Sequence, residues 1–152
     1  MGHATRPGCD QVVFLDAVEH RWVDELGGIN VFFMFDDGRM LTPPFLGPIL
    51  PGIMPASIVA LARARGVKVV ERPYAIDQWR PDAHAGRLLE AFACGTAAVL
   101  APISQVKSTL GDWTVGDGQG GLVTEAVRTE LVDIQRGRTR SRADWVHRVT
   151  PP

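Results

Sequence analysis

Lysine is scarce in this sequence of 152 residues. Of its sixteen basic side chains, fourteen are arginine and only two are lysine, Lys68 and Lys107. Seventeen Asp and Glu side chains leave a formal net charge of −1. Nucleic acids and anionic membranes attract proteins that carry a surplus of positive charge, so this balance argues against both as partners.

Cysteine and histidine are also few. Cys9 and Cys94 form no CxxC pair, and no disulfide framework is indicated. A single disulfide between them is one alternative, but a reducing cytoplasm is the simpler location. The four histidines lie apart without ligand spacing, which argues against a closed zinc site. No apolar run approaches the ~20 residues of a membrane helix. Residues 1–11 show no signal-peptide pattern.

What the sequence does contain is typical of one globular domain. Hydrophobic residues make up 45% and charged residues 22%, which is too apolar for disorder. A domain of this length buries about 68–70% of its unfolded surface. No internal repeat and no long linker interrupts it.

Local patterns predict a mixed α/β or α+β fold with several strands. Runs of β-branched and aromatic residues predict strands at 11–15, 29–35, 39–42, 67–72, 88–94 and 113–115, and one further extended run over 97–106. Helices are expected at 54–65 with Pro55 at the first position, at 78–85 after an N-cap at Asp77, and at 122–136. Gly66, Gly86 and Gly137 would end them. Beyond residue 137 only Trp145 and Val146 are expected to be held firmly.

The start of the first predicted helix is one candidate site. Unpaired backbone N–H groups and the helix dipole favour an anion there, so the amides of Ile53 and Met54, which follow Gly52, could hold a phosphate. The simpler interpretation is that Pro51 and Gly52 only turn the chain into the helix.

Two other segments combine glycine with polar groups. At Cys94-Gly-Thr-Ala97, Gly95 could let a ligand approach the backbone while Thr96 offers a hydroxyl and an amide; the alternative is a glycine bulge with a buried, inert Cys94. Asp24 and Glu25 precede Gly27-Gly28, where a carboxylate could pair with a cationic ring nitrogen; the alternative is a solvated turn.

Asp36-Asp37-Gly38 is interpreted as a hairpin turn rather than a catalytic pair. The arginines after residue 135 could bind phosphate, but a solvated end is the simpler interpretation.

The order of these motifs resembles the C-terminal domain of the branched-chain amino-acid aminotransferases, which are fold-type-IV pyridoxal-phosphate enzymes. The matching strings are Gly8-Cys-Asp-Gln-Val-Val-Phe-Leu-Asp16, Glu25-Leu-Gly-Gly-Ile-Asn30, Leu41-Thr-Pro-Pro44, Leu50-Pro-Gly-Ile53, Phe92-Ala-Cys-Gly-Thr-Ala-Ala98, Gly116-Asp-Gly118 and Ile134-Gln-Arg-Gly137. D-amino-acid aminotransferases and aminodeoxychorismate lyases share some of these strings. The resemblance implies an aminotransferase class IV domain over residues 8–149, an unrelated start at 1–7 and a tail at 150–152.

The resemblance also gives roles to the candidate residues. It implies pyridoxal 5'-phosphate as the cofactor, with Glu25 on its pyridine nitrogen and with Gly28 and Leu50 against its ring. Gly52, Ile53 and Met54 would hold the phosphate, together with Gly95 and Thr96. Thr96 and Ala97 would bind the substrate carboxylate.

Two departures from the family pattern qualify this assignment. Met54-Pro55 stands where the family usually has Thr-Arg, so a hydroxyl donor to the phosphate is missing, a loss of roughly 1.5–3 kcal/mol. The family's Schiff-base lysine lies upstream of the string that begins at Gly8, and neither Lys68 nor Lys107 matches it by motif.

We therefore expect a truncated branched-chain aminotransferase that is inactive alone. The parent reaction would move an amino group between leucine, isoleucine or valine and 2-oxoglutarate. The alternatives are a dimerising or cofactor-binding module without activity, a domain that complements a separate N-terminal half, or a fragment of another fold-type-IV enzyme.

Overall fold

The computed structural model describes residues 8–47, 49, 51–97, 99–109, 111–147 and 149. Its centre is a five-stranded sheet of order β5-β4-β3-β6-β7. Those strands are β3 (Asn30–Phe35), β4 (Arg39–Thr42), β5 (Lys68–Glu71), β6 (Leu88–Gly95) and β7 (Val99–Pro102). Small two-stranded sheets join β1 (Val13–Leu15) to β2 (Val23–Leu26) and β8 (Gln105–Val106) to β9 (Trp113–Thr114). The helices are α1 (Ile53–Ala64), α2 (Ile76–His84) and α3 (Leu122–Gln135), followed by the short 3-10 helix η1 (Ala143–Trp145).

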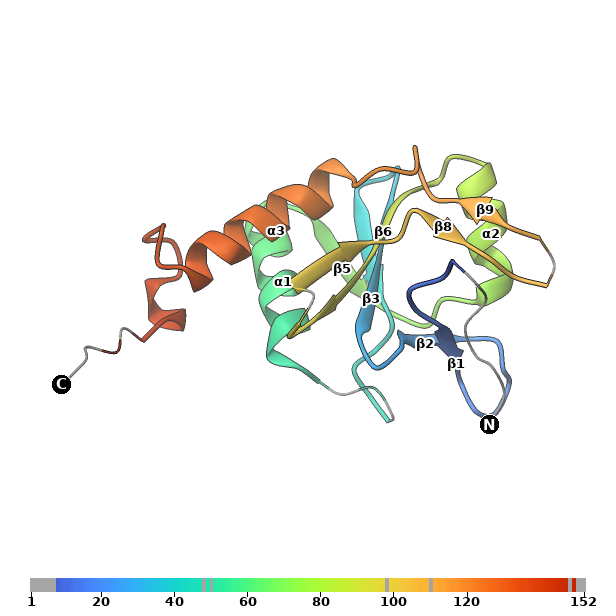
Figure 1. Ribbon diagram of the computed structural model, residues 1–152, viewed down its shortest axis with the longest axis horizontal. Helices are drawn as coiled ribbons and strands as arrows, with labels where there is room; N and C mark the ends of the chain where they lie inside the picture. Colours follow the sequence, from blue (N-terminus) through green and yellow to red (C-terminus); the bar gives the residue numbers. More distant parts are fainter. Residues whose placement is uncertain are drawn as a thin grey trace.

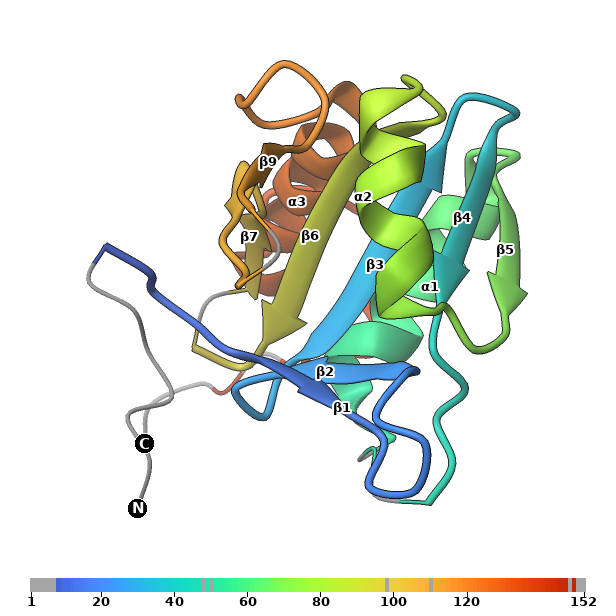
Figure 2. The same cartoon turned by 90° about the vertical axis from the view of Figure 1, so that its right-hand side faces the viewer.

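Helices pack on both faces of the sheet (Figure 1). Because successive side chains of a strand point to opposite faces, β3 divides the core in two. Phe33 and Phe35 pack with Trp79 of α2, whereas Phe32 and Met34 pack with residues of α1 and α3. Figure 2 shows α2 in front of β3 and β6, with α1 and α3 behind them. This layered arrangement confirms the predicted mixed α/β class.

The connection β4–α1–β5 is the parallel unit of the sheet. β5 runs parallel to β4, whereas the pairs β3–β4, β3–β6 and β6–β7 are antiparallel. The parallel register pairs Arg39 with Lys68, so β5 begins beside the end of the β3–β4 hairpin. That hairpin confirms the prediction of a turn at Asp36-Asp37-Gly38.

All three helix ends confirm the predictions from sequence. Gly66, Gly86 and Gly137 have φ of +80°, +69° and +64°, a conformation that only glycine adopts without strain. After α1, the N–H of Gly66 donates to Arg63 O (3.0 Å) and that of Val67 donates to Ala62 O (3.0 Å). These two bonds form a Schellman motif, and equivalent bonds end α2 and α3.

The starts of α1 and α2 and one strand differ from expectation, whereas α3 begins at Leu122 as predicted. α1 begins at Ile53, so Pro55 is its third residue; a proline is tolerated there because the first N–H groups of a helix lack intrahelical acceptors. α2 begins at Ile76 after an N-cap at Ala75, and Asp77 lies inside its first turn instead of capping it. The segment that contains Asp24 and Glu25 is the strand β2 rather than a solvated turn.

The predicted extended run 97–106 is divided between two sheets. β7 pairs with the end of β6, whereas β8 pairs with β9. The 3-10 helix η1 follows α3, and Trp145 and Val146 are 37% and 38% exposed, so the expectation that they are firmly held is not met. Within the described part of the chain, no helix has the length and apolar character needed to cross a bilayer.

Candidate functional site

A tight hairpin turn that contains Gly28 closely follows Glu25 at the end of β2. Leu26 and Ile29 exchange two backbone hydrogen bonds of 2.9 Å each, and Gly27 and Gly28 between them have φ of +54° and +87°. Positive φ at both central positions is the signature of a type I′ turn. A Cβ built on Gly28 would meet no atom within 4 Å, so the space above this glycine is open.

Glu25 and Asp24 are neighbours on β2, where the pairing with β1 shifts: Glu25 pairs with Phe14 and Val23 with Leu15, which leaves Asp24 unpaired. Both side chains are half-buried. Among the described residues, the carboxylate of Glu25 makes no hydrogen bond and no ion pair. Burial, and then the negative charge of Asp16, raise the pKa of Asp24. Glu25 is thus an available acceptor beside the glycine turn.

The start of α1 supplies the second element of the site. Gly52 is the N-cap, and no side chain caps the helix there. The first two helical residues, Ile53 and Met54, carry backbone N–H groups, whereas the third, Pro55, has none. The Met54 side chain points to α3, where Gln135 Nε2 donates to its Sδ (3.7 Å). The helix start can therefore offer an anion two backbone amides and no side-chain donor from these residues.

The tip of the β6–β7 hairpin supplies the third element. Thr96 and Ala97 are exposed beyond the last pair of the hairpin, which joins Gly95 to Val99. Val99 has a φ of +57°, which is costly for a β-branched residue and often marks a functional loop. A Cβ on Gly95 would lie 2.6 Å from Ile29 Cγ2, so close packing against Ile29 explains this glycine.

The sheet register brings these elements together. Asn30, the first residue of β3, pairs with Cys94, the residue before Gly95. A Cβ on Gly52 would lie 3.9 Å from Asn30 Oδ1, so the start of α1 lies beside the same end of β3. The glycine turn, the helix start and the hairpin tip therefore converge around Ile29 and Asn30. Leu50, the predicted ring contact, lies outside the described residues.

Cys94 is unsuited to nucleophilic catalysis. Its side chain is fully buried, and burial raises the pKa of the thiol to about 12. Only the thiolate is a good nucleophile. Cys9 and Cys94 are both free, so the possible bridge between them is absent. No group of three His, Cys, Asp or Glu side chains that could hold a metal ion occurs among the described residues.

Neither lysine lies within the converging elements. Lys68 begins β5 beside Arg39, and β3 runs from Asn30, at the site, towards the hairpin that leads to Arg39. Lys68 is thus at the opposite end of the sheet from the site. Lys107 follows β8, and its Nζ donates to the carbonyl of Gly8 (3.5 Å).

Sequence reasoning missed a cavity of about 460 Å³ that adjoins the glycine turn through Leu26 and Ile29. Trp79, Trp113 and Ile103 also line it. These residues come from distant segments that look like ordinary core in the sequence, and no local pattern signals that they surround a hollow.

Comparison with known proteins gives a consistent result. The family model for amino-transferase class IV matches residues 2–106. The branched-chain-amino-acid aminotransferase of Mycolicibacterium smegmatis is 47% identical over 149 residues, which are 96% of this chain and 40% of that protein. A probable branched-chain-amino-acid aminotransferase of Streptomyces coelicolor is 42% identical over 144 residues, which are 95% of this chain and 40% of that protein.

Solved structures show the same likeness. The branched-chain amino acid aminotransferase of Escherichia coli matches with a TM-score of 0.78 and 29% identity, over 94% of this chain and 43% of that one. The T.th. enzyme complexed with N-(5'-phosphopyridoxyl)-L-glutamate matches with a TM-score of 0.79 and 27% identity, over the same shares. The chain spans about 40% of the length of the curated relatives it matches. It belongs to the class IV aminotransferase family, has the fold of the fold-type-IV enzymes, and corresponds to a C-terminal part of a branched-chain aminotransferase.

Proposed function

We propose that this chain is the cofactor-cradling domain of a branched-chain aminotransferase and that it does not catalyse amino transfer by itself. The parent reaction would exchange an amino group between leucine, isoleucine or valine and 2-oxoglutarate. The observation that carries the proposal is the convergence of the Glu25–Gly28 hairpin, the start of α1 and the hairpin tip around Asn30. A cytoplasmic location, and either a homodimer or a complementing N-terminal half as partner, remain predictions.

The residues present fit pyridoxal 5'-phosphate. The uncapped start of α1 presents the amides of Ile53 and Met54 to a phosphate, beside the N-cap Gly52. Thr96 at the hairpin tip adds a hydroxyl, and Gly28 leaves open space for a flat ring. The carboxylate of Glu25 has no other partner among the described residues, so it can pair with a protonated ring nitrogen. When bound, the cofactor supplies an electron-accepting ring for chemistry at the amino-acid α-carbon.

Two solved structures of one relative support this choice of ligand. The T.th. enzyme has been crystallised with N-(5'-phosphopyridoxyl)-L-glutamate and with pyridoxamine 5'-phosphate. By analogy we assign the substrate carboxylate to the backbone of Thr96 and Ala97, because both residues are exposed at the tip. Gly95 would hold this tip in place through its contact with Ile29.

The missing activity follows from the lysines. The reaction needs an amine that bonds to the cofactor and moves a proton between substrate and cofactor. Lys68 lies at the far end of the sheet, and Lys107 lies against the carbonyl of Gly8. We therefore assign neither of them the catalytic role.

The experiment is borohydride reduction of the purified chain with pyridoxal 5'-phosphate, followed by peptide mass spectrometry. We expect no stoichiometric adduct on any lysine, whereas the M. smegmatis enzyme treated in parallel should be labelled. A stoichiometric adduct on Lys68 or Lys107 would contradict the proposed lack of activity.

A second candidate function is a phosphate-ligand binder without catalysis, favoured by the two amides that remain at the start of α1. Titration with pyridoxal 5'-phosphate should then raise the melting temperature, because a ligand that binds only the folded state stabilises it. Inorganic phosphate is the control for the contribution of the phosphate group alone.

A further inference from the structure

A run of alternating arginines follows α3. Residues 136–142 read Arg-Gly-Arg-Thr-Arg-Ser-Arg, with an arginine at every second position and no acidic residue. All four arginines are exposed. Figure 1 shows this segment beyond α3, at the end of the molecule opposite α2. The formal net charge of the whole chain is −1, so a strongly basic surface segment is set against an acidic remainder. None of its residues belongs to the candidate cofactor site.

The positive charge of this segment is poorly balanced by the rest of the chain. Arg138 Nη1 lies 3.7 Å from Asp133 Oδ1, at the long end of the range for an ion pair. Arg136 and Arg140 form no ion pair within the described part of the chain. Like charges so close together repel one another, so a negative charge placed among them is favoured.

Two hydroxyl groups lie between these arginines, and the structure distinguishes them. Thr139 and Ser141 are the only serine or threonine residues of the sequence with an arginine on both sides. Thr139 is half-buried, and its Oγ1 accepts a hydrogen bond from the N–H of Ser141 (3.2 Å). Ser141 is exposed in a turn between α3 and η1, and its Oγ donates to Glu130 Oε1 only at 3.5 Å, which is the limit for a hydrogen bond. Ser141 therefore offers the more accessible hydroxyl.

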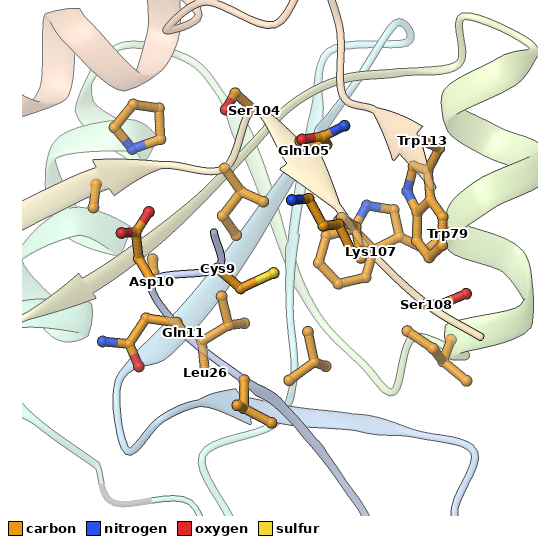
Figure 3. A pocket seen from close by; sticks show the side chains of 18 of the residues that line it. Cys9, Asp10, Gln11, Leu26, Trp79, Ser104, Gln105, Lys107, Ser108 and Trp113 are labelled. Atoms are coloured by element: carbon orange, nitrogen blue, oxygen red, sulfur yellow. The ribbon is translucent and has the colours of Figure 1, made fainter. Parts of the chain in front are cut away.

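The other serines of the chain lack these basic flanks. Ser57, Ser104 and Ser108 have no arginine within five residues on either side. Ser57 lies inside α1, where the backbone is helical. Ser104 and Ser108 line the cavity that Figure 3 shows. These three serines are internal controls for the effect of the arginines.

We propose that Ser141 is a phosphorylation site for an arginine-directed protein kinase, that is, a kinase whose substrate groove is lined by acidic side chains. Such a groove is complementary to the guanidinium groups of Arg138 and Arg140. In the reaction, Ser141 Oγ forms a bond to the γ-phosphorus of ATP while the bond from that phosphorus to the β–γ bridging oxygen breaks. ADP leaves, and the hydroxyl proton passes to the catalytic carboxylate of the kinase. The proposal goes beyond the proposed function and does not depend on cofactor binding.

The charges around Ser141 determine what the phosphate does. A phosphoserine carries a charge of about −1.5 to −2 at pH 7 and three acceptor oxygens. It gains charge-assisted hydrogen bonds from the neighbouring arginines, whereas it loses the hydrogen bond to Glu130 and is repelled by that carboxylate. Glu130 stays paired with Arg65 (2.8 Å). Phosphorylation therefore exchanges a contact between Ser141 and α3 for contacts within residues 136–142.

The experiment incubates the purified chain with magnesium ATP and the catalytic subunit of cyclic-AMP-dependent protein kinase, which is arginine-directed. Peptide mass spectrometry follows the incorporation of phosphate. We expect one phosphate per chain, on Ser141, and none there from casein kinase 2, which selects acidic flanks. Phosphate mainly on Thr139 or on one of the three control serines, or none on Ser141, would overturn the proposal.

Two arginine variants test recognition. Arg138→Gln should slow the incorporation at Ser141 at least about tenfold, because it removes one charge-assisted contact with the kinase. Arg63→Gln is the matched control: Arg63 is also exposed, but it lies in α1 and pairs with Glu71 at 3.6 Å. Circular dichroism checks that both variants are folded. Equal rates for Arg138→Gln and Arg63→Gln would contradict recognition through the arginine run.

Trypsin tests the exchange of contacts. It cleaves after accessible arginines, and pairing with a phosphate shields them, so we expect cleavage within residues 136–142 to slow at least about fivefold after phosphorylation. Cleavage after Arg63 should be unchanged. Equal cleavage of residues 136–142 before and after phosphorylation would contradict the new arginine–phosphate contacts. None of these readouts uses pyridoxal phosphate, so their failure is distinct from failure of the proposed function.

Discussion

At the scale of single residues, Met54 and Gly95 are both expected to contact the cofactor, and the structure shows that both also pack against other parts of the protein. Met54 contributes only its backbone amide to the start of α1, because its thioether accepts a hydrogen bond from Gln135. Gly95 is explained by the methyl group of Ile29, which a Cβ at this position would meet at 2.6 Å. Sequence reasoning placed both residues at the site but could not foresee the neighbours, which lie 81 residues from Met54 and 66 from Gly95.

Met54→Thr should restore a donor to the phosphate of bound pyridoxal 5'-phosphate. One hydrogen bond to a charged group is worth roughly 1.5–3 kcal/mol, so we expect affinity to rise about ten- to hundredfold. Absorbance titration measures the change. Met54→Val is the matched control because it has the same branched shape and also loses the contact with Gln135, but has no hydroxyl. Equal affinities of the two variants would show that the hydroxyl makes no bond.

At the scale of elements, α3 depends on a side chain from the sheet. Glu90 of β6 accepts hydrogen bonds from the N–H groups of Val123 (3.0 Å) and Thr124 (2.8 Å), in the first turn of the helix. The Thr124 hydroxyl also donates to it (2.7 Å). A negative charge at this end of a helix is stabilised by the helix dipole. A Cβ on Gly121 would overlap the carboxylate, so this glycine is what lets Glu90 reach the helix.

Replacing the cap with a neutral side chain should destabilise the domain. Glu90→Gln loses the charge and one acceptor oxygen, and we expect the free energy of unfolding to fall by about 1–2 kcal/mol. Urea unfolding followed by circular dichroism measures it. Glu125→Gln is the control: Glu125 also lies in the first turn of α3, but it is exposed and only pairs with Arg128 at 3.8 Å. That change should cost less than about 0.5 kcal/mol, and an equal cost for both variants would exclude a capping role for Glu90.

The sequence predicted the ends of all three helices but the start of α3 alone, for a physical reason. Gly66, Gly86 and Gly137 end their helices through their own backbone conformation, which is a local property. The start of α3 was predicted but its cap was not, because Glu90 lies 33 residues before Val123. β2 was missed for a similar reason. It is four residues long, its buried residues Val23 and Leu26 do not alternate, and it is held by pairing with β1 and by a backbone hydrogen bond from Val23 N–H to Tyr74 O (2.9 Å).

At the scale of the whole molecule, the residues of the candidate site could be proposed from the sequence, but their spatial arrangement could not. Local patterns marked the glycine turn, the helix start and the hairpin tip only as candidates, and the family resemblance assigned their roles. Their meeting depends on the register that pairs Asn30 with Cys94, which no local pattern specifies. The same holds for the cavity beneath Trp79 and Trp113, because it results from how the layers cover the sheet.

The core also determines how global stability responds to alkaline pH. Cys94 is fully buried, and burial raises the pKa of its thiol from an ordinary value of 9.0 to about 12. Burial, and then the hydrogen bond that Tyr74 donates to Asp82 (2.8 Å), raise the pKa of Tyr74 well above its ordinary value of 10.0. Above pH 9 the unfolded chain therefore releases protons that the folded chain keeps.

The linkage between protonation and folding gives the direction of the effect. The free energy of unfolding keeps its full value below about pH 9 and decreases as the pH rises above it. The thiol alone gives a slope of about 1.4 kcal/mol per pH unit, and the phenol doubles it above about pH 10, so roughly 4 kcal/mol is lost by pH 11. Urea unfolding at several alkaline pH values measures the slope. Because Tyr74 is the only tyrosine, tyrosinate absorbance reports its ionisation directly. Cys94→Ala and Tyr74→Phe should each lower the slope of the free energy of unfolding against pH by the contribution of one proton. A wild-type free energy of unfolding that stays constant up to pH 11 would show that burial does not keep either group protonated.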